Sequence, residues 1–142
     1  MRRTSGTKEE FVGSLDSVQN ITGYVMNEPQ FSESHTECAF CKIIAGRAPA
    51  TVEYEDEELI VIRNQLRWVP LMLLVIPKKH MSQNEMWESQ AIVNVARIGV
   101  EMGSAYSPNG YRLLSNFGRQ AMQSQNHAHL HVLGGRRLGA YV

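Results

Sequence analysis

The sequence predicts an α+β domain built on a mostly antiparallel sheet of about five strands, with one long and one short helix. Apolar segments of strand length follow one another between residues 51 and 133, with turns or loops beside them. A single long amphipathic segment separates the third of these strands from the fourth. Strands that come in a run, without a helix after each one, favour an antiparallel sheet.

The first half of this domain is predicted to hold the short helix and three strands. CKIIAG indicates a helix or turn that ends at Gly46. Strands are predicted over 51–54 and 59–63, with the acidic run 55–58 as the turn between them. Residues 70–76 are almost continuously apolar, so this third strand is expected to be central, and Pro77 ends it.

The second half is predicted to hold the long helix and two further strands. Ser82 and Glu85 have the spacing of a capping box. The apolar residues that follow recur every three or four positions and predict one buried stripe, namely Trp87, Ala91, Val95, Ile98 and Met102. Gly103 is the expected end of this helix. The turn at 107–110 and the polar loop at 116–123 then flank a strand over 111–115, and the last strand covers 126–133.

Residues 1–36 differ in composition from the rest of the chain. They are rich in Ser, Thr, Glu, Asn and Gln, while Phe11, Leu15 and Val18 are spaced like one face of a short helix. We therefore predict a partly helical or flexible N-terminal extension over 1–36, followed by a single domain over 37–142.

The charge of the chain argues against a nucleic-acid polymer as its partner. Lys plus Arg and Asp plus Glu each number 14 in the 142 residues, so the formal net charge is zero. No apolar run reaches membrane-spanning length, and no apolar segment follows the two arginines at the start. We expect a cytoplasmic protein that binds no membrane.

Three histidines alternate along the last predicted strand, at His127, His129 and His131. Because a strand has a period of two residues, their imidazoles point to one face, and the apolar residues between them point toward the long helix. We expect the middle ring to lie exposed. Imidazole serves near neutral pH as a nucleophile, a proton carrier or a metal ligand. Three in register argue against a merely solvated face, but a zinc site on this strand remains an alternative.

Neutral hydrogen-bonding groups precede the histidines. Gln123 and Ser124 lie just before the strand, and Asn116 lies across the loop. Such groups suit a phosphate that is held without permanent ion pairing, although each is also an ordinary loop residue.

The two cysteines, Cys38 and Cys41, form a Cys-x-x-Cys pair. In a reducing compartment this spacing favours a metal site or a redox pair over a structural disulfide. A redox pair is expected in a thioredoxin-like βαβ unit, which the sequence does not predict. Two buried thiols without a ligand are the remaining alternative.

Four segments together resemble the histidine-triad (HIT) superfamily. QSQNHAHLHVLGG (123–135) is similar to its signature, and three further blocks match in order: CAFCKIIAGRAPA (38–50), LVIPKKH (74–80) and YRLLSN (111–116). The resemblance covers about residues 38–139 and implies a HIT-like fold. The Leu-Gly-Gly-Arg ending is closer to the Hint branch, the nucleoside phosphoramidases, than to the dinucleoside polyphosphate hydrolases.

The resemblance implies a role for each residue of the triad. His129 matches the nucleophile that attacks the α-phosphorus of a nucleoside monophosphate derivative and forms a nucleotidyl-histidine. His131 matches the residue that contacts phosphate oxygens, and His127 the one that orients the site. Ser124, Asn116 and Gln123 would bind phosphate or leaving-group atoms.

The implied function is a nucleotide hydrolase or transferase, in particular a purine nucleoside phosphoramidase. Its ligand would be a purine nucleotide such as AMP or GMP, and its assembly a homodimer. The alternatives are a nucleotide-binding module with little turnover and a dinucleoside polyphosphate hydrolase. Apolar residues near the implied base site, at Phe40, Ile43, Ile62 and Leu74, are individually better interpreted as ordinary core.

The resemblance also implies a structural zinc. Some histidine-triad proteins and the related galactose-1-phosphate uridylyltransferases hold zinc with a Cys-x-x-Cys pair, a histidine after the central strand and the first triad histidine. Cys38, Cys41, His80 and His127 occupy the matching positions. No organic cofactor is expected.

The sequence departs from the family around the expected nucleoside pocket. Asn64 stands where the family usually has an acidic residue that binds ribose, so an amide would bond the sugar here. Leu71-Met72 replaces a Gly/Thr-His pair, and Arg67-Trp68 replaces small or polar residues. Arg119 and Met122 stand in the phosphate loop where glycine is common. We therefore expect an altered substrate rather than altered chemistry.

Overall fold

The structure is a computed structural model and describes residues 36–140. The predicted N-terminal extension and its helix lie outside the described residues, so the boundary at residue 36 stays a prediction. No helix in 36–140 is long and apolar enough to cross a membrane.

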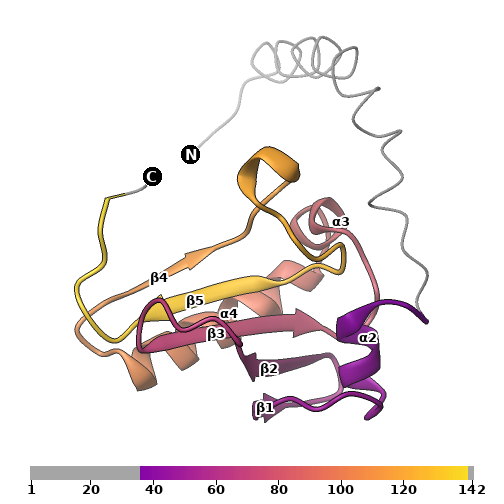
Figure 1. The fold of residues 1–142 in the computed structure, drawn as a ribbon, viewed down its shortest axis with the longest axis horizontal. Coiled ribbons are helices and arrows are strands. Elements are labelled where there is room, and N and C mark those ends of the chain that lie inside the picture. Colours follow the sequence, from indigo (N-terminus) through magenta and orange to yellow (C-terminus); the bar gives the residue numbers. More distant parts are fainter. Residues whose placement is uncertain (1–35, 141–142) are drawn as a thin grey trace, which may run out of the picture. The chain divides into compact units, whose positions relative to one another are not determined.

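A five-stranded antiparallel sheet forms the centre of the domain, in the order β1-β2-β3-β5-β4 (Figure 1). This confirms the predicted fold class and the central place of the third strand, all of whose residues are buried. The strands are β1 (Val52–Glu55), β2 (Leu59–Arg63), β3 (Leu71–Pro77), β4 (Tyr111–Leu114) and β5 (Leu130–Gly134).

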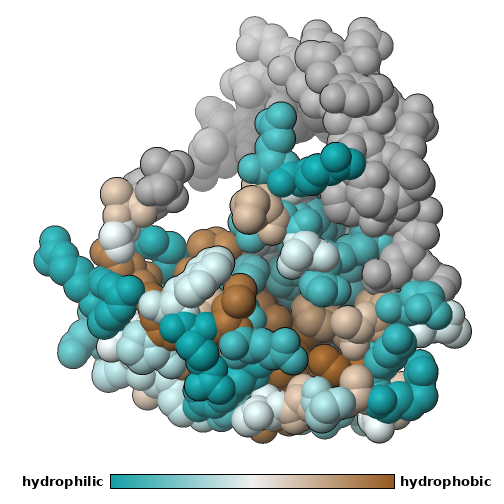
Figure 2. Space-filling view, in the orientation of Figure 1, coloured by the Kyte–Doolittle hydropathy of each residue, from teal (hydrophilic) through white to brown (hydrophobic). Residues whose placement is uncertain are grey.

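Each face of the sheet is covered by a different helix (Figure 1). Because neighbouring strand residues point to opposite faces, β2 and β3 divide their apolar side chains between two clusters. The first cluster contains Leu73 and Val75 and packs against Val95 and Ile98 of α4 (Ala91–Tyr106). The second packs under Phe40 of α2 (Ala39–Ile44). In the same orientation, the surface view shows hydrophobic residues exposed in several patches among hydrophilic ones (Figure 2).

The predicted long helix is divided into two, which corrects the expected helix count. The capping box of Ser82 and Glu85 is present, but it begins the short helix α3 (Gln83–Trp87). The Ser89 hydroxyl then accepts from the backbone N–H of Ala91 at 3.2 Å, a local bond that competes with a continuous helix. Trp87, predicted to be buried, is 43% exposed, because it belongs to α3 and not to the stripe on α4.

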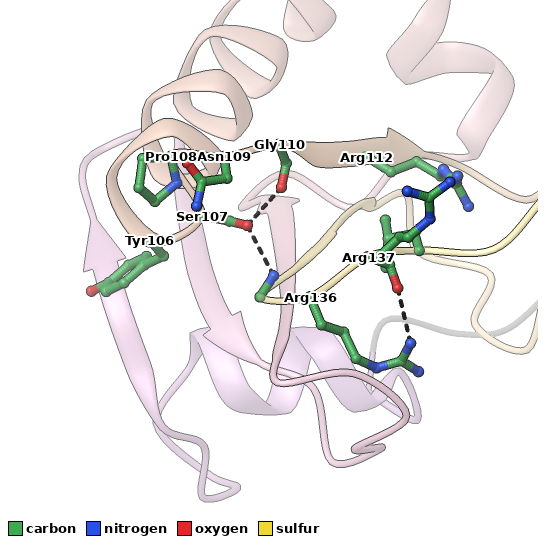
Figure 3. Close-up of a pocket in the computed structure, with 10 residues that line it drawn as sticks. Tyr106, Ser107, Pro108, Asn109, Gly110, Arg112, Arg136 and Arg137 are labelled. Atoms are coloured by element: carbon green, nitrogen blue, oxygen red, sulfur yellow. Dashed lines mark hydrogen bonds between the residues drawn. The ribbon is translucent and has the colours of Figure 1, made fainter.

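The predicted end of the long helix at Gly103 is also wrong, because α4 continues to Tyr106. Gly103 is buried beneath the ring of Tyr111, where a Cβ atom would overlap that ring. Its glycine is therefore required by close packing inside the helix, not by a helix end. The turn predicted at 107–110 is present. The Ser107 hydroxyl donates to Gly110 O at 2.6 Å and accepts from Gly135 N at 2.9 Å (Figure 3).

The last strand begins at Leu130, four residues later than predicted. Its partner β3 pairs with it only as far as Val75, and beyond this point Pro77 has no N–H to continue the ladder. Ala128 N instead donates to Met81 O at 2.8 Å, outside the sheet. Two of the three histidines therefore lie in the segment that enters β5, and the third lies in β5 itself.

Candidate active site and metal centre

His129 is held in place at three points. Its backbone N–H donates to Gln83 Oε1 at 3.1 Å, and its carbonyl oxygen accepts from Ser115 Oγ at 2.8 Å. Its ring Nδ1 lies 2.8 Å from the carbonyl oxygen of His127. A carbonyl only accepts hydrogen bonds, so Nδ1 carries the proton of the neutral ring. Nε2 therefore keeps a lone pair, and within residues 36–140 it has no hydrogen-bond partner.

The side chain of His129 is not exposed as expected, because only 3% of the residue is accessible to solvent. The rings of Phe40 and His131 lie against it, with centroids 5.3 and 5.1 Å away. His129 and His131 nevertheless line a cavity of about 850 Å³ on the α2 face of the sheet. The ring is thus largely shielded from bulk water but borders a space of ligand size.

Burial keeps both cavity histidines neutral. It lowers the pKa of His129, an effect that the bond to the His127 carbonyl partly opposes. Burial and the neighbouring His129 together lower the pKa of His131 to about 4. At neutral pH each ring is therefore uncharged, and an uncharged ring is the form that has a lone pair for nucleophilic attack.

The low pKa of His131 predicts a pH dependence of stability. Between about pH 4 and the ordinary histidine value of 6.5, the unfolded state binds more protons at this residue than the folded state does. The free energy of unfolding should therefore fall as the pH is lowered through this range. Denaturant titrations from pH 7 to pH 4.5 should show a shallower fall in His131→Gln than in the unmodified chain. Equal slopes in the two proteins would contradict this.

The structure brings most of the predicted phosphate-binding residues to the cavity, but not all. Asn116, Ser124 and Asn64 line it. Gln123 is not among the lining residues, because both ends of its amide close its own loop. Its Oε1 accepts from Gly118 N at 2.7 Å, and its Nε2 donates to Gln125 O at 3.0 Å. Gln125 lines the cavity in its place.

Gln83 is a further residue of this site that the sequence did not single out. It is 2% exposed and joins two parts of the site. Its Oε1 accepts from His129 N, and its Nε2 donates to the backbone oxygen of Asn116 at 3.1 Å. A glutamine after a helix cap is common on protein surfaces, so only the tertiary contacts identify it as a positioning residue.

We predict that Gln83→Met lowers both the stability of the protein and its turnover. Methionine has a similar volume but leaves His129 N–H and the Asn116 carbonyl without partners. The expected cost is about 1–3 kcal/mol of stability. Turnover should fall about tenfold through kcat, with KM little changed, because His129 is less well held. Gln90→Met is the matched control, since Gln90 is exposed and its side chain makes no capping bond. An unchanged kcat in Gln83→Met would argue against positioning.

The four predicted metal ligands lie close together, and one of them, His127, belongs to the triad. The ligand atoms of Cys38, Cys41, His80 and His127 all lie within 4.8 Å of one another. Cys38 Sγ is 3.4 Å from His127 Nδ1, and Cys41 Sγ is 3.3 Å from His80 Nδ1. Tetrahedral zinc with ordinary bond lengths separates sulfur and nitrogen ligands by roughly 3.5 Å. The set therefore fits zinc in both chemistry and spacing.

The imidazole of His127 is oriented for this role. Its Nε2 lies 2.7 Å from the carbonyl oxygen of Pro77, so that nitrogen carries the proton and Nδ1 presents its lone pair to the cysteines. Both cysteines are free thiols, and burial raises the pKa of Cys38 to about 11. A thiol with a raised pKa is a poor redox nucleophile, which favours the metal interpretation over the redox one. Metal binding would release the thiol proton.

A second cavity, of about 670 Å³, lies by the turn before β4 and the segment after β5 (Figure 3). No histidine is among its lining residues. Of the two cavities, only the one on the α2 face is lined by histidines of the triad.

Fold and site together define a class of protein: an antiparallel α+β domain that presents a row of histidines to a cavity beside a Cys/His cluster. The model of the HIT domain matches residues 45–138. An uncharacterized HIT-like protein from Chlamydia trachomatis is 34% identical over 105 residues, which cover 71% of this chain and 95% of that protein. The chain belongs to the HIT family.

Solved structures agree with this assignment. A HIT family hydrolase from Clostridium thermocellum has a TM-score of 0.66 and 34% identity, over 74% of this chain and 96% of its own. A zinc-bound histidine triad family protein from Mycobacterium smegmatis has a TM-score of 0.65 and 30% identity, over 72% of this chain and 78% of its own.

Proposed function

We propose that this protein is a nucleotide hydrolase or transferase that acts on the α-phosphorus of nucleoside monophosphate derivatives, with a purine nucleoside phosphoramidate as the preferred substrate class. The observation that carries the proposal is the state of His129. Its Nδ1 proton is committed to the His127 carbonyl, and its Nε2 has a lone pair beside an 850 Å³ cavity. The hydrolase from Clostridium thermocellum supports the same reaction class.

The reaction proceeds in two displacements. His129 Nε2 forms a bond to the α-phosphorus as the phosphorus–nitrogen bond of the substrate breaks, and the departing amine takes up a proton from the solvent. Water then attacks phosphorus and releases one proton to the solvent, the Nε2–phosphorus bond breaks, and the nucleoside monophosphate leaves. Covalent catalysis replaces one difficult displacement by two easier ones. His131, Ser124 and Asn116 line the same cavity, which supports a role for them in binding phosphate oxygens as charge develops.

Zinc is proposed as a structural ion at Cys38, Cys41, His80 and His127, and the zinc-bound relative from Mycobacterium smegmatis supports it. Zinc at this place would hold α2 to the end of β3 and fix the ring of His127. Because the His127 carbonyl also holds Nδ1 of His129, the same residue would connect the metal to the nucleophile.

The proposal is tested by incubating the protein with adenosine 5′-phosphoramidate and following the release of AMP and ammonia. Steady turnover, with a protein species heavier by one adenylyl group after rapid acid quenching, is the expected result. Tight binding of AMP without any release of product would instead favour a nucleotide-binding module. Faster cleavage of a diadenosine polyphosphate than of the phosphoramidate would favour the alternative hydrolase.

A homodimer remains a prediction of the family resemblance. Within the described sheet, β4 is an edge strand with half-buried residues, and a second copy paired there would extend the sheet. Sedimentation of the full chain measures this directly.

A further inference from the structure

The segment from Asn64 to Trp68, here called the rim loop, follows β2 and lines the 850 Å³ cavity. Its backbone is held by specific contacts. Asn64 N donates to Met72 O at 2.8 Å, and Trp68 N donates to Met72 Sδ at 3.2 Å. Arg136 Nη2 donates to Trp68 O at 3.3 Å. The rim loop therefore presents its side chains to the cavity from a defined backbone.

The part of the cavity beside the rim loop carries an excess of positive charge. Two arginines, Arg63 and Arg67, belong to the lining, which contains no Asp or Glu. Arg63 is neutralised by Glu53, with Nε and Oε2 2.6 Å apart. Arg67 is exposed and makes no ion pair within residues 36–140. One positive charge thus stands at the rim without a counter-charge from the described part of the protein.

Asn64 offers the same kind of group as Arg67. Its Oδ1 already accepts from Leu66 N at 3.0 Å, a bond that shapes the rim loop. The Nδ2 amide has no hydrogen-bond partner within residues 36–140 and can donate to a ligand. Two neighbouring donors, one of them charged, are complementary to an anionic group that accepts hydrogen bonds.

The distance between the rim loop and His131 can be estimated from the β3 residues to which each is bonded. Leu74 is paired with His131. Asn64 N donates to the carbonyl oxygen of Met72, which lies two residues before Leu74 in the same strand. At about 3.3 Å per residue, the rim loop begins roughly 7 Å from the level of His131 along the sheet. This separation is of the order of one sugar ring.

We propose that the rim loop recognises a second phosphate carried on the ribose, so that the cavity prefers nucleoside 5′-phosphate derivatives bearing a 2′- or 3′-phosphate. The inference rests on the proposed function, which places the reacting 5′-phosphorus at His129. Arg67 supplies the charge and Asn64 the neutral donor, while the paired Arg63 keeps Glu53 from repelling the anion.

The test compares kcat/KM for adenosine 5′-phosphoramidate with that for its 2′- and 3′-phosphorylated forms. One phosphorylated form should be preferred at least about tenfold, as expected for charge-assisted hydrogen bonds. Arg67→Gln should reduce this preference to below about threefold. Asn64→Asp should reverse it, because a carboxylate repels phosphate. Arg97→Gln is the matched control: it also removes one charge, but from an exposed position on α4 outside the cavity.

Binding of the products separates this inference from the proposed function. Calorimetry is used to compare AMP with adenosine 2′,5′- and 3′,5′-bisphosphate, and the same order of preference is expected. Hydrolysis of the plain phosphoramidate with no preference for either phosphorylated form overturns the inference and leaves the proposed function intact. If no phosphoramidate is hydrolysed, the proposed function fails. Equal affinities for AMP and the bisphosphates would then overturn the inference as well.

Discussion

Replacing His129 with alanine should abolish turnover of adenosine 5′-phosphoramidate, lowering kcat by a factor on the order of 10⁴ or more. The reason is that, among the described residues that line the cavity, only His129 has its ring held by a backbone carbonyl so that Nε2 keeps the lone pair. His131 borders the same space, but its ring is not tied to a backbone carbonyl as His129 is by the His127 oxygen at 2.8 Å. Removal of the imidazole takes away the covalent route itself, not merely part of the charge stabilisation.

His131→Ala provides the comparison that makes this prediction specific. It removes an imidazole from the same cavity and should lower kcat by about 10²–10³, because it takes away a contact to the developing charge. It should still form the adenylylated protein on acid quenching, whereas His129→Ala should not. An adduct of normal abundance in His129→Ala, or turnover close to that of the unmodified chain, would reject His129 as the nucleophile.

Removing the metal ligands should have the largest effect on stability. We expect the protein as isolated to hold one zinc, and Cys38→Ser with Cys41→Ser to remove it. Structural zinc contributes about 10–16 kcal/mol in small domains that cannot fold without it. This domain has its own buried core, so a loss of several kcal/mol and a fall in Tm of more than about 10 °C are expected. A strong chelator should lower the Tm of the unmodified chain in the same way.

Metal analysis distinguishes the four-residue site from a metal held by the triad. Zinc lost with both cysteines, and retained in His131→Ala, fits the site at Cys38, Cys41, His80 and His127. Zinc retained after both cysteines are replaced would place the metal on the triad and weaken the assignment of His129 as a nucleophile. Activity should fall together with zinc, because His127, whose ring is a proposed zinc ligand, also holds His129 through its carbonyl.

Local patterns in the sequence were sufficient to predict the structure wherever one kind of contact dominates. The span of β2 was predicted without error, because charged residues bound an apolar run that can only be buried as a strand. The common face of the triad follows from the period of an extended chain. The ring centroids of His80 and His127 lie 4.9 Å apart, and those of His129 and His131 lie 5.1 Å apart. The Phe40 centroid lies 5.8 Å from that of His127 and 5.3 Å from that of His129. The metal ligands were predicted from the family resemblance, and their distances fit that prediction.

The helix ends and the roles of individual glutamines could not be predicted from the sequence, because local contacts compete there with contacts between distant residues. The Ser89 hydroxyl and the packing of Gly103 against Tyr111 decide where the helices begin and end, and neither has a distinctive sequence pattern. Gln123 and Gln83 are both glutamines beside polar residues. One closes its own loop while the other bonds to the backbone of His129, a difference created by residues 33 and 46 positions away along the chain.

The sequence by itself therefore determined the α+β sheet and the row of imidazoles, because alternation and spacing act over a few residues, whereas the Cys/His set was predicted from the family resemblance. Only the tertiary structure decided that His129 is buried, that it lines a cavity and that Gln83 bonds to its backbone. These properties depend on which distant groups satisfy buried polar atoms, and that is settled when the chain packs.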